Sequence, residues 1–150
     1  DVFDHLKTLR ASALRGVLIL GLACATTVAW AQDKVVYHIN NAEAQATAGL
    51  RNIRNHLDVA PKTQIVVVTH AEGIDFLREG AKDKKNADID YNALVNALKS
   101  RGVRFEICEI TITGAGLKKD QFTMDADFVP SGVARITELQ TREGFAYIKP

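Results

Sequence analysis

Cys108 is the residue best suited to chemistry in this sequence, because a thiolate is a strong nucleophile. It ends a short apolar strand pattern over residues 103–108, and a loop rich in threonine and glycine follows. Ligands of an α/β sheet bind at the carboxyl ends of its strands. Cys24, the other cysteine, falls in an N-terminal apolar segment, so Cys108 has no partner for an internal disulfide in the remaining chain. Two interpretations follow: a reactive thiol, or a small buried hydrophobe.

Other polar side chains follow the ends of two further strand patterns. His38 and Asn40 close the first pattern, and His70 closes the second. If the strands are neighbours, these side chains meet Cys108 at one edge of the sheet, where substrate would bind. Imidazole is the usual acid or base at neutral pH, so His70 is a candidate to orient or deprotonate the thiol. The alternatives are a buried structural histidine at His38 and a solvent-facing one at His70.

The charge near Cys108 decides whether a thiolate forms. A nearby helix N-terminus or a cation would favour the thiolate. His70 is one candidate source, and the helix expected to begin near Leu117 is the other. Glu106 alternates onto the Cys108 face, and with Glu109 it would oppose ionisation. Gly114, Gly116 and the backbone amides of their loop are predicted to hold the anionic part of a substrate.

Several other kinds of site lack support in the sequence. His38, His70 and Cys108 would suit zinc or copper by ligand type, but no CxxC or HxxxH spacing accompanies them. The Gly-Ala-Gly stretch at 114–116 is too short for a phosphate-binding loop, and no serine lies in a GxSxG elbow. Ser131 is best explained as a helix cap. We therefore expect neither a metal nor another cofactor.

The overall composition is that of one globular domain. The chain has 150 residues, of which 47% are hydrophobic and 25% charged, with a formal net charge of +1. Basic residues are scattered, without the basic patch that nucleic-acid binding requires. We therefore expect no nucleic-acid partner.

The first 31 residues read as a targeting segment. Lys7, Arg10 and Arg15 precede an apolar run, which ends in the small-x-small pattern of residues 29–31. A secretory signal peptide is the leading interpretation, and an uncleaved membrane anchor over residues 11–31 is the second.

A lipoprotein signal ending at Cys24 is a weaker rival, because glycine stands where such signals carry a branched residue. Each of these interpretations places the domain of residues 32–150 outside the cytoplasm. The expected location is the periplasm or another extracytoplasmic compartment, either free or anchored to the inner membrane.

Strand and helix patterns alternate along the rest of the chain. Strands are predicted at residues 34–40, 64–70, 103–108, 127–129 and 145–148. One helix is predicted to start at an N-cap in Asn40-Asn41 and to stop before Pro61, and others are predicted at 74–81, 91–100, 117–122 and 133–141. Alternation of this kind favours a flavodoxin-like three-layer α/β sandwich with a mostly parallel five-stranded sheet.

The sequence resembles the DsrE/DsrF-like family, in its branch of small exported proteins, over about residues 34–150. The matching stretches are residues 35–39, 50–57, 66–74, 102–108, 129–133 and 144–148. The resemblance implies a flavodoxin-like domain that assembles as a homotrimer or homohexamer. It also implies sulfur relay, in which a cysteine at the end of this strand carries a persulfide and passes the sulfur to a partner protein. Cys108 matches that position.

The export segment departs from the best-known relay members, which are cytoplasmic. It makes sulfane sulfur from sulfide, thiosulfate or polysulfide a better expectation than a role in tRNA modification. The leading hypothesis is a sulfur carrier or sulfurtransferase-like protein with a persulfide on Cys108 and a protein that donates or accepts the sulfur. The alternative is a non-catalytic oligomeric binding or assembly module, free or membrane-tethered. A small metal-binding protein is the third hypothesis.

Overall fold

The structure is a computed structural model, and it describes residues 32–150. Cys24 and the predicted signal or anchor of residues 1–31 lie outside the described residues. The strands are β1 (Lys34–Asn41), β2 (Gln64–Glu72), β3 (Arg104–Cys108), β4 (Ala126–Val129) and β5 (Ala146–Ile148). The α-helices are α1 (Ala42–Val59), α2 (Tyr91–Lys99), α3 (Glu109–Gly114) and α4 (Gly132–Thr141), with short 3₁₀ turns at Asp75–Leu77 and Lys119–Gln121.

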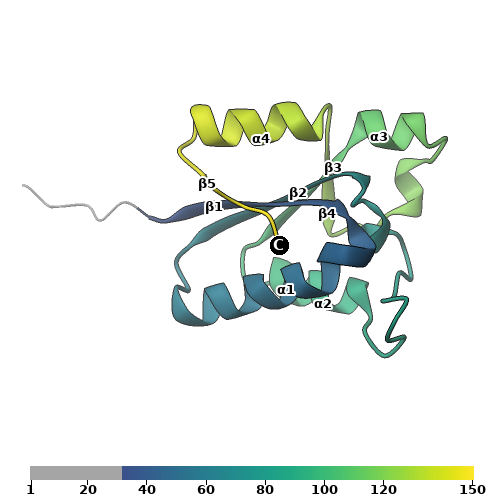
Figure 1. The fold of residues 1–150 in the computed structure, drawn as a ribbon, viewed down its shortest axis with the longest axis horizontal. Helices are drawn as coiled ribbons and strands as arrows, with labels where there is room; N and C mark the ends of the chain where they lie inside the picture. Colours follow the sequence, from purple (N-terminus) through teal and green to yellow (C-terminus); the bar gives the residue numbers. More distant parts are fainter. Residues whose placement is uncertain (1–31) are drawn as a thin grey trace, which may run out of the picture. The chain divides into compact units, whose positions relative to one another are not determined.

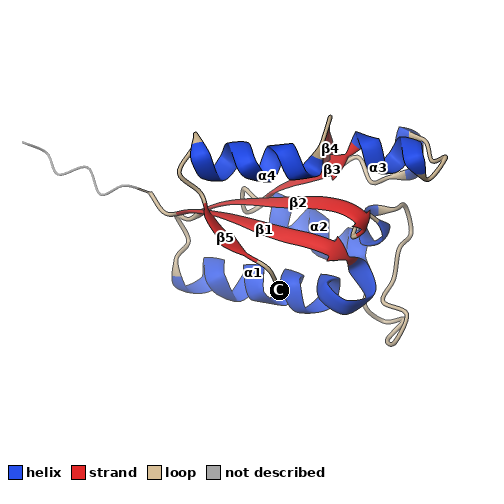
Figure 2. Cartoon of the chain, turned by 45° about the horizontal axis from the view of Figure 1, so that its top comes forward, coloured by secondary structure: helices blue, strands red, loops and turns tan. Residues whose placement is uncertain are grey.

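The five strands form one sheet in the order β4-β3-β2-β1-β5, and every pairing is parallel. Helices α1 and α2 cover one face, while α3 and α4 lie on the other (Figure 1). Figure 2 shows the strands between these two helix layers. The prediction of a flavodoxin-like sandwich is therefore confirmed, and the sheet is parallel throughout.

The β-branched runs of the central strands form a core on both faces of the sheet. In β2, residues 65–69 are all buried, as expected for a parallel strand covered on both sides. The smaller core cluster lies under α4 and contains Val36, Val66, Val68, Ile136, Leu139 and Phe145. Since side chains alternate along a strand, this α4 face is also the face of His38, His70 and Cys108.

Helix α1 follows the pattern read from the sequence. The Asn41 side chain caps it by accepting a hydrogen bond from the Ala44 amide at 2.9 Å. Leu50, Ile53 and Leu57 are buried against the sheet, and the helix ends before Pro61 as predicted.

Two predicted helices are wrong in type. The segment 74–81 contains only the 3₁₀ turn Asp75–Leu77, because Arg78 is extended and Gly80 takes a positive φ of 71°. The segment 117–122 contains only the 3₁₀ turn Lys119–Gln121. An isolated antiparallel β-bridge between Arg78 and Phe122 joins the two segments. Their backbone is extended at these residues and not helical.

The loop expected after Cys108 is wrong too, because residues Glu109–Gly114 form helix α3. Four consecutive β-branched residues, 110–113, lower its helix propensity and hid it from the sequence pattern. Burial of Ile112 holds the helix on the sheet. None of the helices described within residues 32–150 is long and apolar enough to cross a membrane.

Candidate functional site

Strand β3 delivers Cys108 to the carboxyl edge of the sheet. Cys108 is the last residue of the strand and the N-cap residue of α3, with 5% of its surface exposed. Its thiol is free. The residue therefore stands where a strand turns directly into a helix, and the first amides of that helix are close to the sulfur.

Two helix N-termini meet at the thiol and favour its ionised form. Burial alone would raise the pKa of Cys108, but hydrogen bonds from the Thr111 hydroxyl and the amides of Gly132, Thr111 and Ile110 outweigh burial and lower the pKa below its ordinary value. The amides belong to the first turns of α3 and α4. These two helices replace the one expected near Leu117 as the source of thiolate stabilisation.

Thr111 also ties the thiol to the end of β2. Its hydroxyl oxygen accepts a hydrogen bond from the Ala71 amide at 3.1 Å, which leaves the hydroxyl proton for the sulfur. Ala71 has a positive φ of 49°, a conformation that costs energy in a residue other than glycine. The turn after His70 is thus held in an unusual shape beside the thiol.

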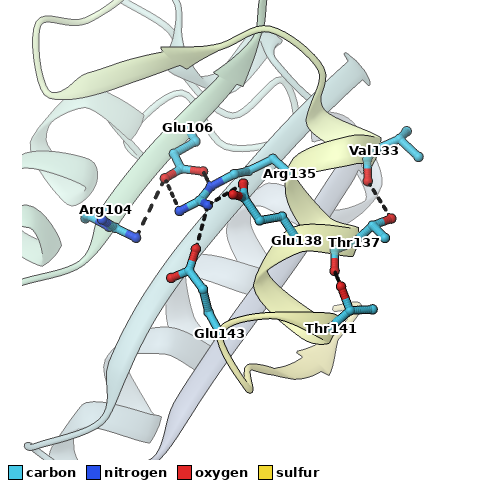
Figure 3. Close-up of polar contacts among 8 residues, drawn as sticks. All are labelled: Arg104, Glu106, Val133, Arg135, Thr137, Glu138, Thr141 and Glu143. Carbon is cyan, nitrogen blue, oxygen red and sulfur yellow. Dashed lines mark hydrogen bonds and ion pairs between the residues drawn. The ribbon is translucent and has the colours of Figure 1, made fainter.

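The carboxylate expected to oppose ionisation is neutralised. Glu106 does lie on the Cys108 face, where its side chain is 7% exposed and accepts a hydrogen bond from Arg135 Nε at 2.9 Å. Arg135 also donates to Glu138 and Glu143, both at 2.8 Å (Figure 3). Burial tends to lower the pKa of Arg135, but these hydrogen bonds raise it above its ordinary value. The guanidinium therefore stays charged beside Glu106.

Glu109, the second carboxylate near the thiol, is also paired. It forms an ion pair with Lys119, which lies in the turn after α3. Neither glutamate near Cys108 is left as an uncompensated negative charge.

His38 and His70 form a direct pair across β1 and β2. The His38 Nε2 and His70 Nε2 atoms are 2.7 Å apart, and the two rings are stacked with centroids 4.7 Å apart. The other nitrogen of His38, Nδ1, lies 2.6 Å from the Tyr147 hydroxyl on β5. Sequence reasoning missed Tyr147, because nothing in the sequence pattern places the last strand beside the first.

Both imidazoles are held in the neutral form. Burial is the main cause, and the positive charge of Lys149 adds to it, so the pKa of His70 is lowered. In His38, burial, His70 and Lys149 together lower the pKa from 6.5 to about 4. A neutral pair agrees with the short N···N contact, in which one nitrogen must donate and the other accept.

His70 and Cys108 are neighbours on the α4 face. Thr69 of β2 pairs with Ile107 of β3, so the residues that follow them, His70 and Cys108, lie side by side. Gly132 packs against both His70 and Cys108. No hydrogen bond joins the His70 ring to the thiol among the described residues, and the ring nitrogen Nε2 faces His38 instead.

The remaining candidate residues lie farther from the thiol. Asn40 is half-buried at the end of β1, and its backbone amide donates to Gln45 Oε1 at 2.9 Å. Gly114 and Gly116 lie at the C-terminal end of α3, whereas Cys108 is at its N-terminal end. The structure therefore brings His70, His38 and Cys108 to one edge but does not bring Gly114 and Gly116 to the thiol.

No group of three His, Cys, Asp or Glu side chains in residues 32–150 is arranged to hold a metal ion. The fold and the site define a flavodoxin-like α/β domain with a free thiol at the carboxyl edge of a parallel sheet, between two helix N-termini. The family model of the DsrE/DsrF-like family matches residues 13–150, so the chain belongs to that family. Membership supports a role of the sulfur-relay type in general, and the resemblance read from the sequence is confirmed.

Two solved structures share the fold. MTH1491 from Methanobacterium thermoautotrophicum, described as a protein of unknown function, is 33% identical with a TM-score of 0.69; the match covers 79% of this chain and 100% of that one. The ychN protein from E. coli is 9% identical with a TM-score of 0.65, over 80% of this chain and 100% of that one. No curated protein matches this chain.

Proposed function

We propose that this protein is a sulfur carrier that holds sulfane sulfur as a persulfide on Cys108, outside the cytoplasm. The observation that carries the proposal is the position of the Cys108 thiol in a DsrE/DsrF-like chain, facing the first amides of α3 and α4 and the Thr111 hydroxyl. Such donors stabilise a thiolate, which is the nucleophilic form of cysteine.

The loading step needs no outside oxidant. The Cys108 thiolate attacks the sulfane sulfur of a donor such as thiosulfate or polysulfide, a new S–S bond forms, and the donor's bond to that sulfur breaks. The leaving group departs with the electron pair, as sulfite from thiosulfate or as a shortened polysulfide. The terminal sulfur of the persulfide is then attacked by a thiolate of an acceptor protein, and Cys108 leaves as the thiolate.

Neighbouring side chains supply supporting roles in this proposal. His70 stands beside the thiol on the next strand, where it would orient the sulfur. His38 and Asn40 border the same edge and would contact the donor. The amides at the start of α3 and α4 take over the anion-holding role that the sequence suggested for Gly114 and Gly116. A homotrimer or homohexamer is the assembly that family resemblance favours.

The burial of Cys108 favours one alternative, a non-catalytic binding or assembly module in which the thiol only packs. Ile110 and Val133, which flank Cys108 in the first turns of α3 and α4, are 66% and 60% exposed and offer an apolar contact surface. A thiol that alkylating reagents do not reach in the folded protein would support this alternative.

Cyanolysis of bound sulfur tests the proposal. The full chain is incubated with polysulfide, desalted and treated with cyanide, which removes sulfane sulfur as thiocyanate. With Cys24→Ser in both proteins, so that Cys108 is the only cysteine of the parent, we expect stoichiometric thiocyanate from the parent protein and none above background from Cys108→Ser. Equal yields from both proteins would contradict a persulfide on Cys108.

A further inference from the structure

Three side chains from three strands form a continuous hydrogen-bonded chain that ends beside Cys108. Tyr147 of β5 bonds His38 Nδ1 at 2.6 Å, and His38 Nε2 of β1 bonds His70 Nε2 of β2 at 2.7 Å. The Tyr147 side is open to solvent, with 42% of the residue exposed. The opposite end is the remaining nitrogen of His70, Nδ1.

The chain admits only two arrangements of its protons. Between the two Nε2 atoms, one nitrogen carries the proton and the other accepts it. In the first arrangement, Tyr147 donates to His38, His38 donates from Nε2 to His70, and His70 carries its proton on Nδ1. In the second arrangement every bond is reversed, and His70 Nδ1 carries a bare lone pair. The proton on one ring nitrogen is thus decided by the bond at the other.

The surroundings favour the first arrangement. A phenol hydroxyl is a good donor to an imidazole nitrogen, and the rotation of its proton is not restricted. A lone pair on His70 Nδ1 would repel the negative charge that the helix amides draw onto the Cys108 sulfur, whereas an N–H would stabilise it. Lys149 acts on both rings and disfavours a second proton on either, so the chain stays neutral as a whole.

We propose that Tyr147 and His38 are positioning residues, which fix His70 as the Nδ1–H tautomer, and that this N–H donates a hydrogen bond to the sulfur when Cys108 ionises, a bond that the structure of residues 32–150 does not contain. Gly132 packs against the Cβ atoms of both His70 and Cys108, so the two side chains start side by side on the same face of the sheet. The extension from the thiolate to the persulfide rests on the proposed function, but the tautomer and its bond to the thiolate do not.

Nitrogen NMR of the full chain tests the tautomer directly. In the ¹⁵N-labelled protein at neutral pH, long-range ¹H–¹⁵N correlations report which ring nitrogen carries the proton. We expect His70 to be protonated at Nδ1 and His38 at Nε2. Protonation of His70 at Nε2 would overturn the proposal.

A pair of matched variants tests the direction of control. Tyr147→Phe removes the donor at the head of the chain, so we expect the tautomer preference of both histidines to weaken. Tyr37→Phe is the control. The Tyr37 hydroxyl lies 3.0 Å from Nδ1 of another histidine, His56, which does not belong to this hydrogen-bonded chain. This variant should leave His38 and His70 unchanged. An unaltered His70 tautomer in Tyr147→Phe would contradict the role of Tyr147.

Titration of the thiol tests the contact with sulfur. As Cys108 ionises, the His70 Nδ1–H signal should shift in the parent protein and stay constant in Cys108→Ser. A signal that ignores the ionisation would overturn the proposed bond. Because this test uses the thiolate, it is independent of whether a persulfide forms, and a failed cyanolysis assay would count against the proposed function alone.

Discussion

The backbone of Gly132 packs directly on the side chain of Cys108. A Cβ atom at position 132 would lie 3.3 Å from the Cβ of Cys108, and only 3.2 Å from the Cβ of His70. This contact holds the first turn of α4 on the edges of β2 and β3, so that its leading amide faces the thiol. A single glycine thus joins the thiol, the imidazole and a helix N-terminus into one site.

Gly132→Ala should disturb that site. The added methyl group would also lie 3.2 Å from the Thr69 carbonyl oxygen, so the helix or the strands must shift. We expect a loss of about 1–3 kcal/mol in the free energy of unfolding, as in other overpacked interiors, together with a change in Cys108 alkylation. Gly114→Ala is the control, because a methyl group there meets no atom within 4 Å. Equal stability of both variants in urea would refute the contact.

Thr111→Val should make Cys108 less reactive at neutral pH. The variant keeps the shape of the side chain but removes the hydroxyl that stabilises the thiolate. A hydrogen bond to a charged group contributes about 1.5 kcal/mol or more, so alkylation of the folded protein should slow by about tenfold at pH 7. Its pH profile should move to higher pH.

The control for that experiment is Thr113→Val, an exposed site in the same helix. It should leave the alkylation profile unchanged. If both threonine variants behave alike, the Thr111 hydroxyl does not set the ionisation of Cys108.

Arg135→Met should be strongly destabilising, because it leaves Glu106 buried without its partner. Breaking a buried ion pair on one side costs about 3–5 kcal/mol, and the partial exposure of Arg135 puts the expected loss near the lower limit. The double variant Glu106→Leu with Arg135→Met should recover most of that loss, since no buried charge remains. Urea unfolding of parent, single and double variants gives the coupling between the two sites; additive losses would show that they are independent.

The stability of the protein should fall as the pH is lowered from about 7 to 4. His38 has its pKa lowered from 6.5 to about 4 in the folded state. Between these values the unfolded chain binds a proton that the folded chain does not, so acid favours unfolding. His70 acts in the same direction. His38→Gln should flatten the pH dependence measured by urea unfolding, and an unchanged slope would argue against a buried neutral His38.

Local patterns in the sequence predicted the features of the fold and site that depend on neighbouring residues. The β-branched runs gave the central strands, Asn41 and Ser131 gave two helix caps that the structure confirms, and the strand ends pointed to Cys108, His38 and His70. Strand order was not predictable in this way. The placement of β5 beside β1 brings Tyr147 to His38, and this contact spans 109 residues of chain.

The electrostatics of the thiol depended on similar long-range contacts. Glu106 alternates onto the Cys108 face as read from the sequence, but its partner Arg135 comes from α4, the helix that follows the next strand, β4. Helix α3 was hidden because its β-branched residues have low helix propensity and only packing of Ile112 on the sheet favours it. Tertiary packing supplies both pieces of information, and local pattern contains neither.

Intact-mass spectrometry before and after exposure to polysulfide shows whether Cys108 takes up sulfur, with Cys108→Ser measured alongside and Cys24→Ser present in both proteins. We expect the parent protein to gain the mass of one sulfur atom, a reductant to reverse the gain, and Cys108→Ser to gain nothing. No gain on the parent, or the same gain on Cys108→Ser, would contradict the proposal that Cys108 carries sulfane sulfur.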